Sequence, residues 1–198
     1  MCLRVAITGG IACGKSLFSH YLGQLGVDIL DADDVVHRLE APGGAAVAAI
    51  RALFGEQVVR PDGGIDRAVL GDIVFPHAAA RDQLNRLIHP LVKAVIHEWL
   101  ELPGGRLKAV VIPLLFEVGW DRDWDVIICL ACSEAVQIDR LMRIRGLSAE
   151  QARKRVAAQM PVAEKAARAH RVVNNDADAE ALAREASDVY RFLMERSE

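Results

Sequence analysis

The chain lacks a long apolar run. Its longest such stretch, residues 109–116 of 198, is far shorter than the roughly 20 residues of a membrane-spanning helix. The first apolar stretch is only a few residues long and leads into a glycine-rich segment, unlike a secretory signal. We therefore expect a protein of the cytoplasm that has no membrane partner.

An excess of positive charge is absent as well, and cysteines are few. The formal net charge is −3, so nucleic acid is not a favoured partner. The four cysteines, at positions 2, 13, 129 and 132, show no disulfide-framework spacing, which fits a reducing compartment. Cys129 and Cys132 form a C-x-x-C pair, but zinc would need a second ligand pair. Because residues three apart on a strand face opposite sides, we expect no metal or redox role for them.

The most informative segment present is Gly9-Gly10-Ile11-Ala12-Cys13-Gly14-Lys15-Ser16. It matches G-x-x-x-x-G-K-[ST], the phosphate-binding loop. Residues 3–8 before it are apolar and rich in β-branched side chains, as in a buried parallel strand. Residues 16–25 after it carry apolar side chains at helical spacing, and Gly26 is a natural helix end. The sequence thus predicts the strand, loop and helix order that a phosphate loop requires.

The residue types of this loop suit a nucleoside triphosphate. Glycines let backbone N–H groups approach phosphate oxygens, and the following helix directs its positive N-terminus at the same anion. Lys15 adds a full charge at the β- and γ-phosphates, and the Ser16 hydroxyl can bind Mg²⁺. The loop alone does not identify the group that accepts the phosphate.

Two carboxylates follow the predicted second strand, residues 27–30. Ligands of open α/β sheets bind beyond the carboxyl ends of strands, so Asp31 and Asp33 are well placed for chemistry. The alternative is local, because Asp33 or Asp34 could cap the helix expected over residues 35–39.

Residues 42–105 do not resemble a regular βαβ unit. Helices are expected near residues 45–54, 67–73, 77–88 and 91–100, with His89-Pro90 separating the last two. This block is a candidate acceptor-binding insertion.

A buried strand over residues 108–112 follows, and Glu117 is the only acid close behind it. Glu117 could hold substrate or a Mg²⁺-bound water, or it could be a solvated loop acid.

Basic residues gather in the segment that follows a further strand, residues 125–132. A helix with Ser133 as N-cap and Gly146 at its end carries Arg140 and Arg143 on one face. Ser148 then begins a capping-box pattern and a second basic helix. Two such helices resemble a mobile lid that would bring arginine to the transferred phosphoryl group. The alternative is a pair of solvated helical faces. A last strand near residues 171–175 and a closing helix to about residue 195 complete the pattern.

Together these segments resemble the dephospho-CoA kinases. The resemblance covers nearly the whole chain, and several of its motifs are uncommon outside that family. In chain order the motifs are Thr8-Gly9-Gly10-Ile11, Asp31-Ala32-Asp33-Asp34-Val35-Val36, Leu87-Ile88-His89-Pro90-Leu91-Val92, Pro113-Leu114-Leu115-Phe116-Glu117, Gln137-x-x-Arg140-Leu141-x-x-Arg143, Gln159-Met160-Pro161 on to Lys165, and Val172-Val173-Asn174-Asn175.

The resemblance implies transfer of phosphate from ATP, with Mg²⁺, to the ribose 3′-hydroxyl of dephospho-CoA, the last step of coenzyme A synthesis. It implies a P-loop kinase of the α/β class, with a parallel five-stranded sheet flanked by helices. We expect its core near residues 1–34, 106–132 and 170–198, a helical acceptor-binding subdomain near 35–105 and a lid near 133–169. We further expect a monomer or a weak homo-oligomer.

The resemblance also assigns site residues. Asp33, Lys15 and Arg140 are the expected catalytic residues, with Asp33 meeting the acceptor hydroxyl. The expected nucleotide-binding residues are Gly10, Ile11, Ala12, Cys13, Gly14, Lys15, Ser16, Leu17, Arg140 and Asn174, with Ser16 on the magnesium ion. The expected substrate-binding residues are Thr8, Asp33, His89 and Glu117.

Some positions depart from the family pattern. Ala12-Cys13 stands where Gly-Ser is usual, Leu17 where Thr is common, and Asn174 where Asp is usual. None of these changes removes a group that the chemistry requires. Two other functions stay open, namely another small-molecule P-loop kinase, such as one for nucleoside monophosphates or shikimate, and a regulatory P-loop switch. Against a GTPase, the sequence contains no Asn-Lys-x-Asp guanine motif.

Overall fold

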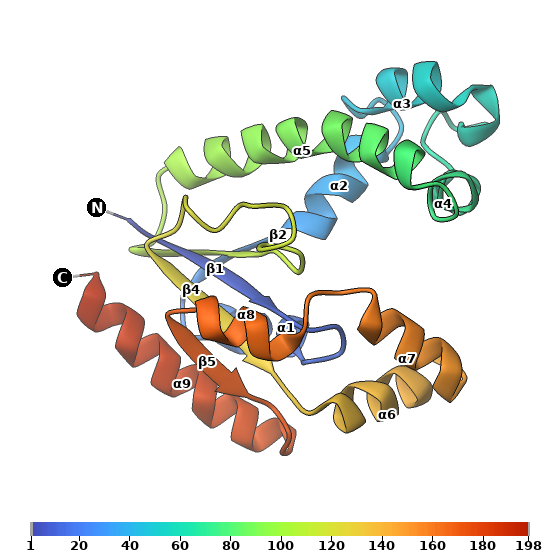
Figure 1. Cartoon of the computed structure of the whole chain (residues 1–198). Helices are drawn as coiled ribbons and strands as arrows, with labels where there is room; N and C mark the ends of the chain where they lie inside the picture. Colours follow the sequence, from blue (N-terminus) through green and yellow to red (C-terminus); the bar gives the residue numbers. More distant parts are fainter. Residues whose placement is uncertain (1, 198) are drawn as a thin grey trace. The chain divides into compact units, whose positions relative to one another are not determined.

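The computed structural model describes residues 2–197, and its central element is a five-stranded sheet (Figure 1). The strands are β1 (Leu3–Gly9), β2 (Asp28–Asp31), β3 (Leu107–Val111), β4 (Val126–Ala131) and β5 (Arg171–Asn174). Their order across the sheet is β2-β3-β1-β4-β5, and β1 pairs parallel with both β3 and β4. The predicted α/β fold with a five-stranded parallel sheet is confirmed.

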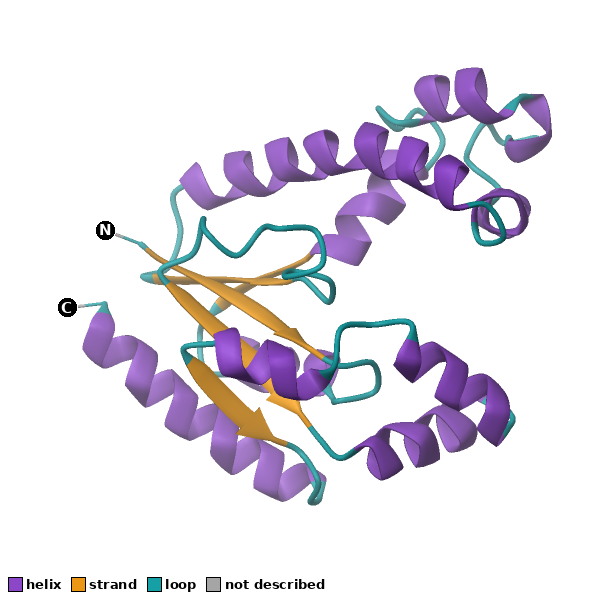
Figure 2. Cartoon of the chain, in the orientation of Figure 1, coloured by secondary structure: helices purple, strands orange, loops and turns teal. Residues whose placement is uncertain are grey.

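The inner strands are mainly apolar because both of their faces are covered. Every residue of β3 and β4 is buried, which explains why their sequences do not alternate between apolar and polar and are apolar except for Lys108 in β3. One face of the sheet forms a core with helices α1 (Lys15–Gln24) and α9 (Ala179–Arg196). Helix α8 (Val162–Arg168) contacts β1 and β4, and Figure 2 shows it in front of these strands, with α9 behind.

Helices α6 (Glu134–Arg145) and α7 (Ala149–Ala157) pack against each other. Their ends confirm the prediction from sequence. The Ser133 side chain accepts from Val136 N–H, Gly146 ends α6 in the left-handed region with φ 63°, and Ser148 closes a capping box with Gln151.

The chain divides into two compact units, one made of residues up to Leu30 and from Pro103 onward, the other of Asp31–Leu102. The second unit is helical. Its elements are α2 (Ala32–Glu40), α3 (Val47–Phe54), the 3₁₀ turn η1 (Glu56–Val58), α4 (Arg67–Val74) and α5 (Ala78–Glu101). Helix α5 packs against α2, α3 and α4.

The prediction for residues 77–100 was wrong in one respect. His89-Pro90 does not separate two helices, because α5 runs without interruption through Pro90. Proline in a helix interior costs about 3 kcal/mol. Ile88, Val92 and Ile96 form a buried stripe that continues past Pro90. Burying three such side chains stabilises the helix by about 1.5–3 kcal/mol each, which outweighs the proline.

The alternative that Asp33 or Asp34 caps the helix after β2 is wrong. Helix α2 begins at Ala32, earlier than predicted, and its N-cap is Asp31, with neither Asp33 nor Asp34 in that position. Asp31 Oδ1 accepts a hydrogen bond of 2.8 Å from Asp33 N–H.

No helix within residues 2–197 is long and apolar enough to cross a bilayer.

Candidate functional site

The phosphate loop joins β1 to α1 and requires glycine at both ends. Gly9 has φ 140°, and a Cβ there would lie 2.1 Å from Leu130 O, so only glycine fits beside β4. Gly14 has φ 91°, and a Cβ there would lie 2.2 Å from Asn175 Nδ2. Helix α1 begins directly at Lys15, so the amides of its first turn adjoin the loop.

Two cationic side chains from distant parts of the chain hold carbonyls of this loop. Lys15 Nζ donates to Gly9 O at 3.2 Å and to Gly10 O at 2.7 Å. Arg140, on α6, donates through Nη1 to Ala12 O at 3.2 Å. The fold thus brings together the two residues that the sequence assigns to phosphate charge.

Two glutamines that sequence reasoning left without a role contact the same loop. Gln159 Oε1 accepts from Ile11 N–H at 3.0 Å, and Gln137 Nε2 donates to Ile11 O at 2.8 Å. Next to Ile11, Ala12 has φ 59°, the only positive φ of a non-glycine residue between positions 2 and 197. The family motifs contained both glutamines, but only the structure shows what they contact.

The end of β5 supplies another contact that the sequence did not assign. Asn175 is buried, and its Nδ2 donates to Cys13 O at 2.9 Å. Asn174, the residue predicted to bind nucleotide, is exposed at the last position of β5. The only sequence signal for a site residue here was an asparagine at the end of a predicted strand. That signal does not distinguish Asn174 from Asn175.

Cys13 and Cys132 lie together although 119 residues separate them. Both are free and buried, and their Sγ atoms are 3.2 Å apart. The hydrogen bond from Cys132, with help from the Lys15 charge, lowers the pKa of Cys13 from 9.0 to about 7. The same contact raises the pKa of Cys132, and burial raises the pKa of Cys129 to about 11.

Thr8 and Glu117 are linked through Lys165 and the carbonyl of Pro113, in the segment that follows β3. Thr8 Oγ1 donates to Pro113 O at 3.3 Å, and Lys165 Nζ donates to the same carbonyl at 2.9 Å. Glu117 Oε1 lies 2.7 Å from Lys165 Nζ and accepts from Met160 N–H at 3.2 Å. The predicted substrate role of these two residues stays a prediction. The contacts just given join Glu117 to α8 and to the chain before it, and Thr8 to the segment after β3.

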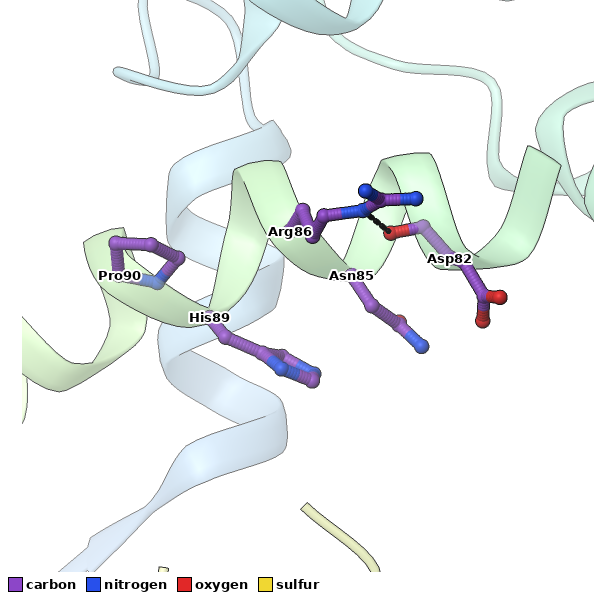
Figure 3. Close-up of a pocket in the computed structure, with 5 residues that line it drawn as sticks. All are labelled: Asp82, Asn85, Arg86, His89 and Pro90. Carbon is purple, nitrogen blue, oxygen red and sulfur yellow. Dashed lines mark hydrogen bonds between the residues drawn. The ribbon is translucent and has the colours of Figure 1, made fainter. Parts of the chain in front are cut away.

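The second unit holds Asp33 and His89. Asp33 is exposed in the first turn of α2, whereas the Asp31 carboxylate caps that helix. His89 lines a hollow of about 440 Å³ on α5, together with Asp82, Asn85, Arg86 and Pro90. Figure 3 shows the side chains of Asp82, Asn85 and His89 projecting from the same side of the helix. Burial, and to a lesser extent the charge of Lys93, lowers the pKa of His89, so the neutral imidazole is favoured.

Comparisons with known proteins agree on one family. The model of the family described as dephospho-CoA kinase matches residues 3–181. A dephospho-CoA kinase of Streptomyces avermitilis is 39% identical over 197 residues, covering 98% of this chain and 96% of that protein. One from Symbiobacterium thermophilum is 42% identical over 174 residues, covering 86% of this chain and 73% of that protein.

Solved structures give the same fold. The crystal structure of the protein TT1252 from Thermus thermophilus matches with a TM-score of 0.84 at 31% identity, covering 97% of this chain and 98% of that one. A shikimate kinase from Acinetobacter baumannii matches with a TM-score of 0.57 at 14% identity, covering 99% and 95%. The second likeness concerns the fold alone.

Proposed function

The chain belongs to the dephospho-CoA kinase family, which phosphorylates dephospho-CoA to coenzyme A with ATP, and from this premise we propose which hydroxyl and which residues take part. The acceptor is the ribose 3′-hydroxyl. Its oxygen attacks the γ-phosphorus, the bond from that phosphorus to the β-γ bridging oxygen breaks, and ADP leaves. The acceptor proton goes to the Asp33 carboxylate.

One observation supports phosphoryl transfer from a triphosphate bound at this loop. Lys15 and Arg140 both donate to carbonyls of a single glycine-rich loop at the start of α1. When a triphosphate occupies the loop, its oxygens are stronger acceptors than neutral carbonyls, so both cations would turn to it. Phosphoryl transfer depends mainly on positioning and on charge stabilisation, and these residues supply both. The amides of the loop and of the first turn of α1 would hold the other phosphate oxygens.

The residues present also suit Mg²⁺. Ser16 is exposed in the first turn of α1, beside the loop, and its hydroxyl is an oxygen ligand of the kind that Mg²⁺ prefers. In kinase sites Mg²⁺ keeps several waters and is held largely by substrate phosphates, so the Ser16 hydroxyl would supply one protein oxygen of its shell. When bound, the ion would neutralise charge on the β- and γ-phosphates.

The arrangement of α2 favours Asp33 over Asp31 as the residue that meets the acceptor. The Asp31 carboxylate is used in capping α2, while the Asp33 side chain is exposed. A ribose hydroxyl is a weak acid and loses its proton late in a loose transition state. A carboxylate can therefore align it first and accept its proton afterwards.

The second unit is the proposed site for the remainder of dephospho-CoA. Its helices do not continue the sheet, and the hollow on α5 combines the neutral imidazole of His89 with amide and charged groups. We further propose that the protein acts in the cytoplasm as a monomer or a weak homo-oligomer, without nucleic-acid or membrane partners. The net charge of −3 and the lack of long apolar runs support the absence of nucleic-acid and membrane partners.

An ADP-release assay with ATP, Mg²⁺ and dephospho-CoA tests the proposal, with 3′-deoxy- and 2′-deoxy-dephospho-CoA as matched acceptors. We expect turnover with dephospho-CoA and with the 2′-deoxy compound, and none with the 3′-deoxy compound. Turnover with the 3′-deoxy compound would show that another hydroxyl is phosphorylated. Efficient phosphorylation of shikimate or of a nucleoside monophosphate, with none of dephospho-CoA, would overturn the acceptor.

A further inference from the structure

We propose that Gln137 and Gln159 are positioning residues of the nucleotide site, which hold the phosphate loop by both backbone groups of Ile11. Gln159 accepts the Ile11 N–H at 3.0 Å, and Gln137 donates to the Ile11 carbonyl at 2.8 Å. Gln137 lies on α6, and Gln159 lies between α7 and α8, so one stretch of chain supplies both amides. This goes beyond the proposed function and rests on it only in that the loop binds ATP.

The loop needs such support at this point. Ile11 precedes Ala12, whose φ of 59° is a conformation that residues with a Cβ rarely adopt. Backbone of this kind persists only where the surroundings determine it. Three hydrogen bonds with side chains converge here. Ile11 N–H donates to Gln159, Gln137 donates to Ile11 O, and Arg140 donates to Ala12 O. They hold the loop in one shape before nucleotide arrives, which lowers the ordering cost of binding.

Glutamine suits both positions because the two bonds have opposite polarity. One bond requires an acceptor and the other a donor, and an amide side chain carries both. Gln137 is only 3% exposed, so water competes little for its hydrogen bond. Gly10 gives Gln137 room, since a Cβ at Gly10 would lie 2.5 Å from its Nε2.

The arrangement links the loop to the helix that carries Arg140. Gln137 and Arg140 lie three residues apart on α6 and bond to adjacent loop residues, Ile11 and Ala12. A displacement of α6 would therefore change the loop and the arginine together. Nucleotide binding and the placement of Arg140 become parts of one structural unit.

The test measures ADP affinity by calorimetry, and the KM for ATP, the KM for dephospho-CoA and kcat by turnover, on full-length protein. Gln137→Met and Gln159→Met keep the length of the side chain and remove the amide. We expect each to weaken ADP binding and raise the KM for ATP about fivefold to tenfold, the usual net worth of one or two hydrogen bonds. The KM for dephospho-CoA should change less than about twofold, because the Ile11 bonds concern the nucleotide loop.

The matched control is Gln151→Met. Gln151 lies on α7 and closes the capping box with Ser148, so this change removes a glutamine hydrogen bond that does not reach the loop. We expect it to lower the melting temperature and to leave ADP affinity unchanged. Equal losses of ADP affinity in the control and in the two loop variants would show that the glutamines contribute only to general stability. That result would overturn the proposal.

A second pair of variants tests the polarity of the bonds. Gln137→Glu removes the donor, whereas Gln159→Glu keeps an acceptor, and both add one negative charge beside the same residue. We expect Gln137→Glu to lose more ADP affinity than Gln159→Glu. The reverse order, or unchanged affinity in folded Gln159→Met, would overturn the assignment even if the buried Gln137 variants failed to fold. ADP binding does not involve the acceptor. The ADP measurements therefore test the role of the two glutamines even if the proposed acceptor is incorrect.

Discussion

Lys165 Nζ lies 2.7 Å from Glu117 Oε1, and the Lys165 side chain is completely buried on α8. Its ammonium group also donates to Pro113 O, which Thr8 contacts from β1. The ion pair therefore joins α8, the segment after β3 and the first strand. A buried charge of this kind is tolerated only when it is paired and hydrogen-bonded.

Removing one partner of this pair should be costly. We expect Glu117→Ala to lower the free energy of unfolding by about 3–5 kcal/mol, because it leaves the buried Lys165 ammonium without its counter-charge. Urea denaturation measures this. The control is Glu150→Ala, which breaks the exposed pair with Lys154 at 2.7 Å and should cost less than about 1 kcal/mol. Equal effects in the two variants would contradict the structural importance of the buried pair.

Lys15→Ala should abolish most turnover without harming the fold. Lys15 donates to two loop carbonyls, and its proposed role is to bind the phosphates. We expect a loss of about 3–4 kcal/mol of transition-state stabilisation, or two to three orders of magnitude in kcat/KM. Steady-state kinetics and circular dichroism check the two parts. A folded variant with normal turnover would remove Lys15 from the site.

Arg140→Lys keeps the charge and loses the planar fork of donors. Because Arg140 is expected to act on charge that develops during transfer, kcat should fall strongly while the Kd for dephospho-CoA changes little. Turnover and calorimetry separate the two quantities. Lost acceptor affinity at unchanged kcat would place Arg140 in the acceptor site instead.

Asp33→Asn should lose kcat while ADP binding survives, since an amide cannot take the acceptor proton. Asp31→Asn is the control at the neighbouring carboxylate. Asparagine caps helices as well as aspartate does, so this variant should have near-normal stability. Its loss of kcat should be smaller than that of Asp33→Asn. The opposite result, with Asp31→Asn inactive and Asp33→Asn active, would exchange the roles of the two residues.

The Cys13 thiol should titrate near neutral pH, because its pKa is lowered to about 7, chiefly by the hydrogen bond from Cys132. In the folded protein, thiolate absorbance near 240 nm should rise through pH 7. Cys132→Ala should move this rise upward, toward the ordinary range of a free thiol. An unchanged titration would show that Cys132 is not the cause.

The same shift predicts how stability depends on pH. The folded pKa lies below the unfolded one, so the contribution of Cys13 to stability is fully present above about pH 9 and is lost as pH falls through about 7. Urea denaturation between these limits should show a smaller rise with pH in Cys132→Ala than in the parent protein.

Features that depend on short stretches of chain were predictable from sequence. The phosphate loop needs glycine where the backbone is left-handed and a lysine where α1 begins, and eight consecutive residues carry this pattern. The buried strand β4 is an apolar run, and β3 is apolar except for Lys108, because both faces of these strands are covered. The caps of α6 and α7 depend on residues within one turn. The family motifs then supplied the reaction.

Tertiary structure decided what depends on partners far apart in the chain. Gln159 lies 148 residues from Ile11, and Asn175 lies 162 residues from Cys13, so no local spacing could reveal that these side chains hold the loop. The local preference of proline predicts that a helix ends at Pro90. In the structure α5 continues through Pro90, because a stripe of buried apolar side chains on this helix stabilises it. Local preferences are worth a few tenths to a few kcal/mol, and burial against distant neighbours exceeds them. For that reason the phosphate loop is predictable from the sequence, but only the tertiary structure determines which side chains hold the loop.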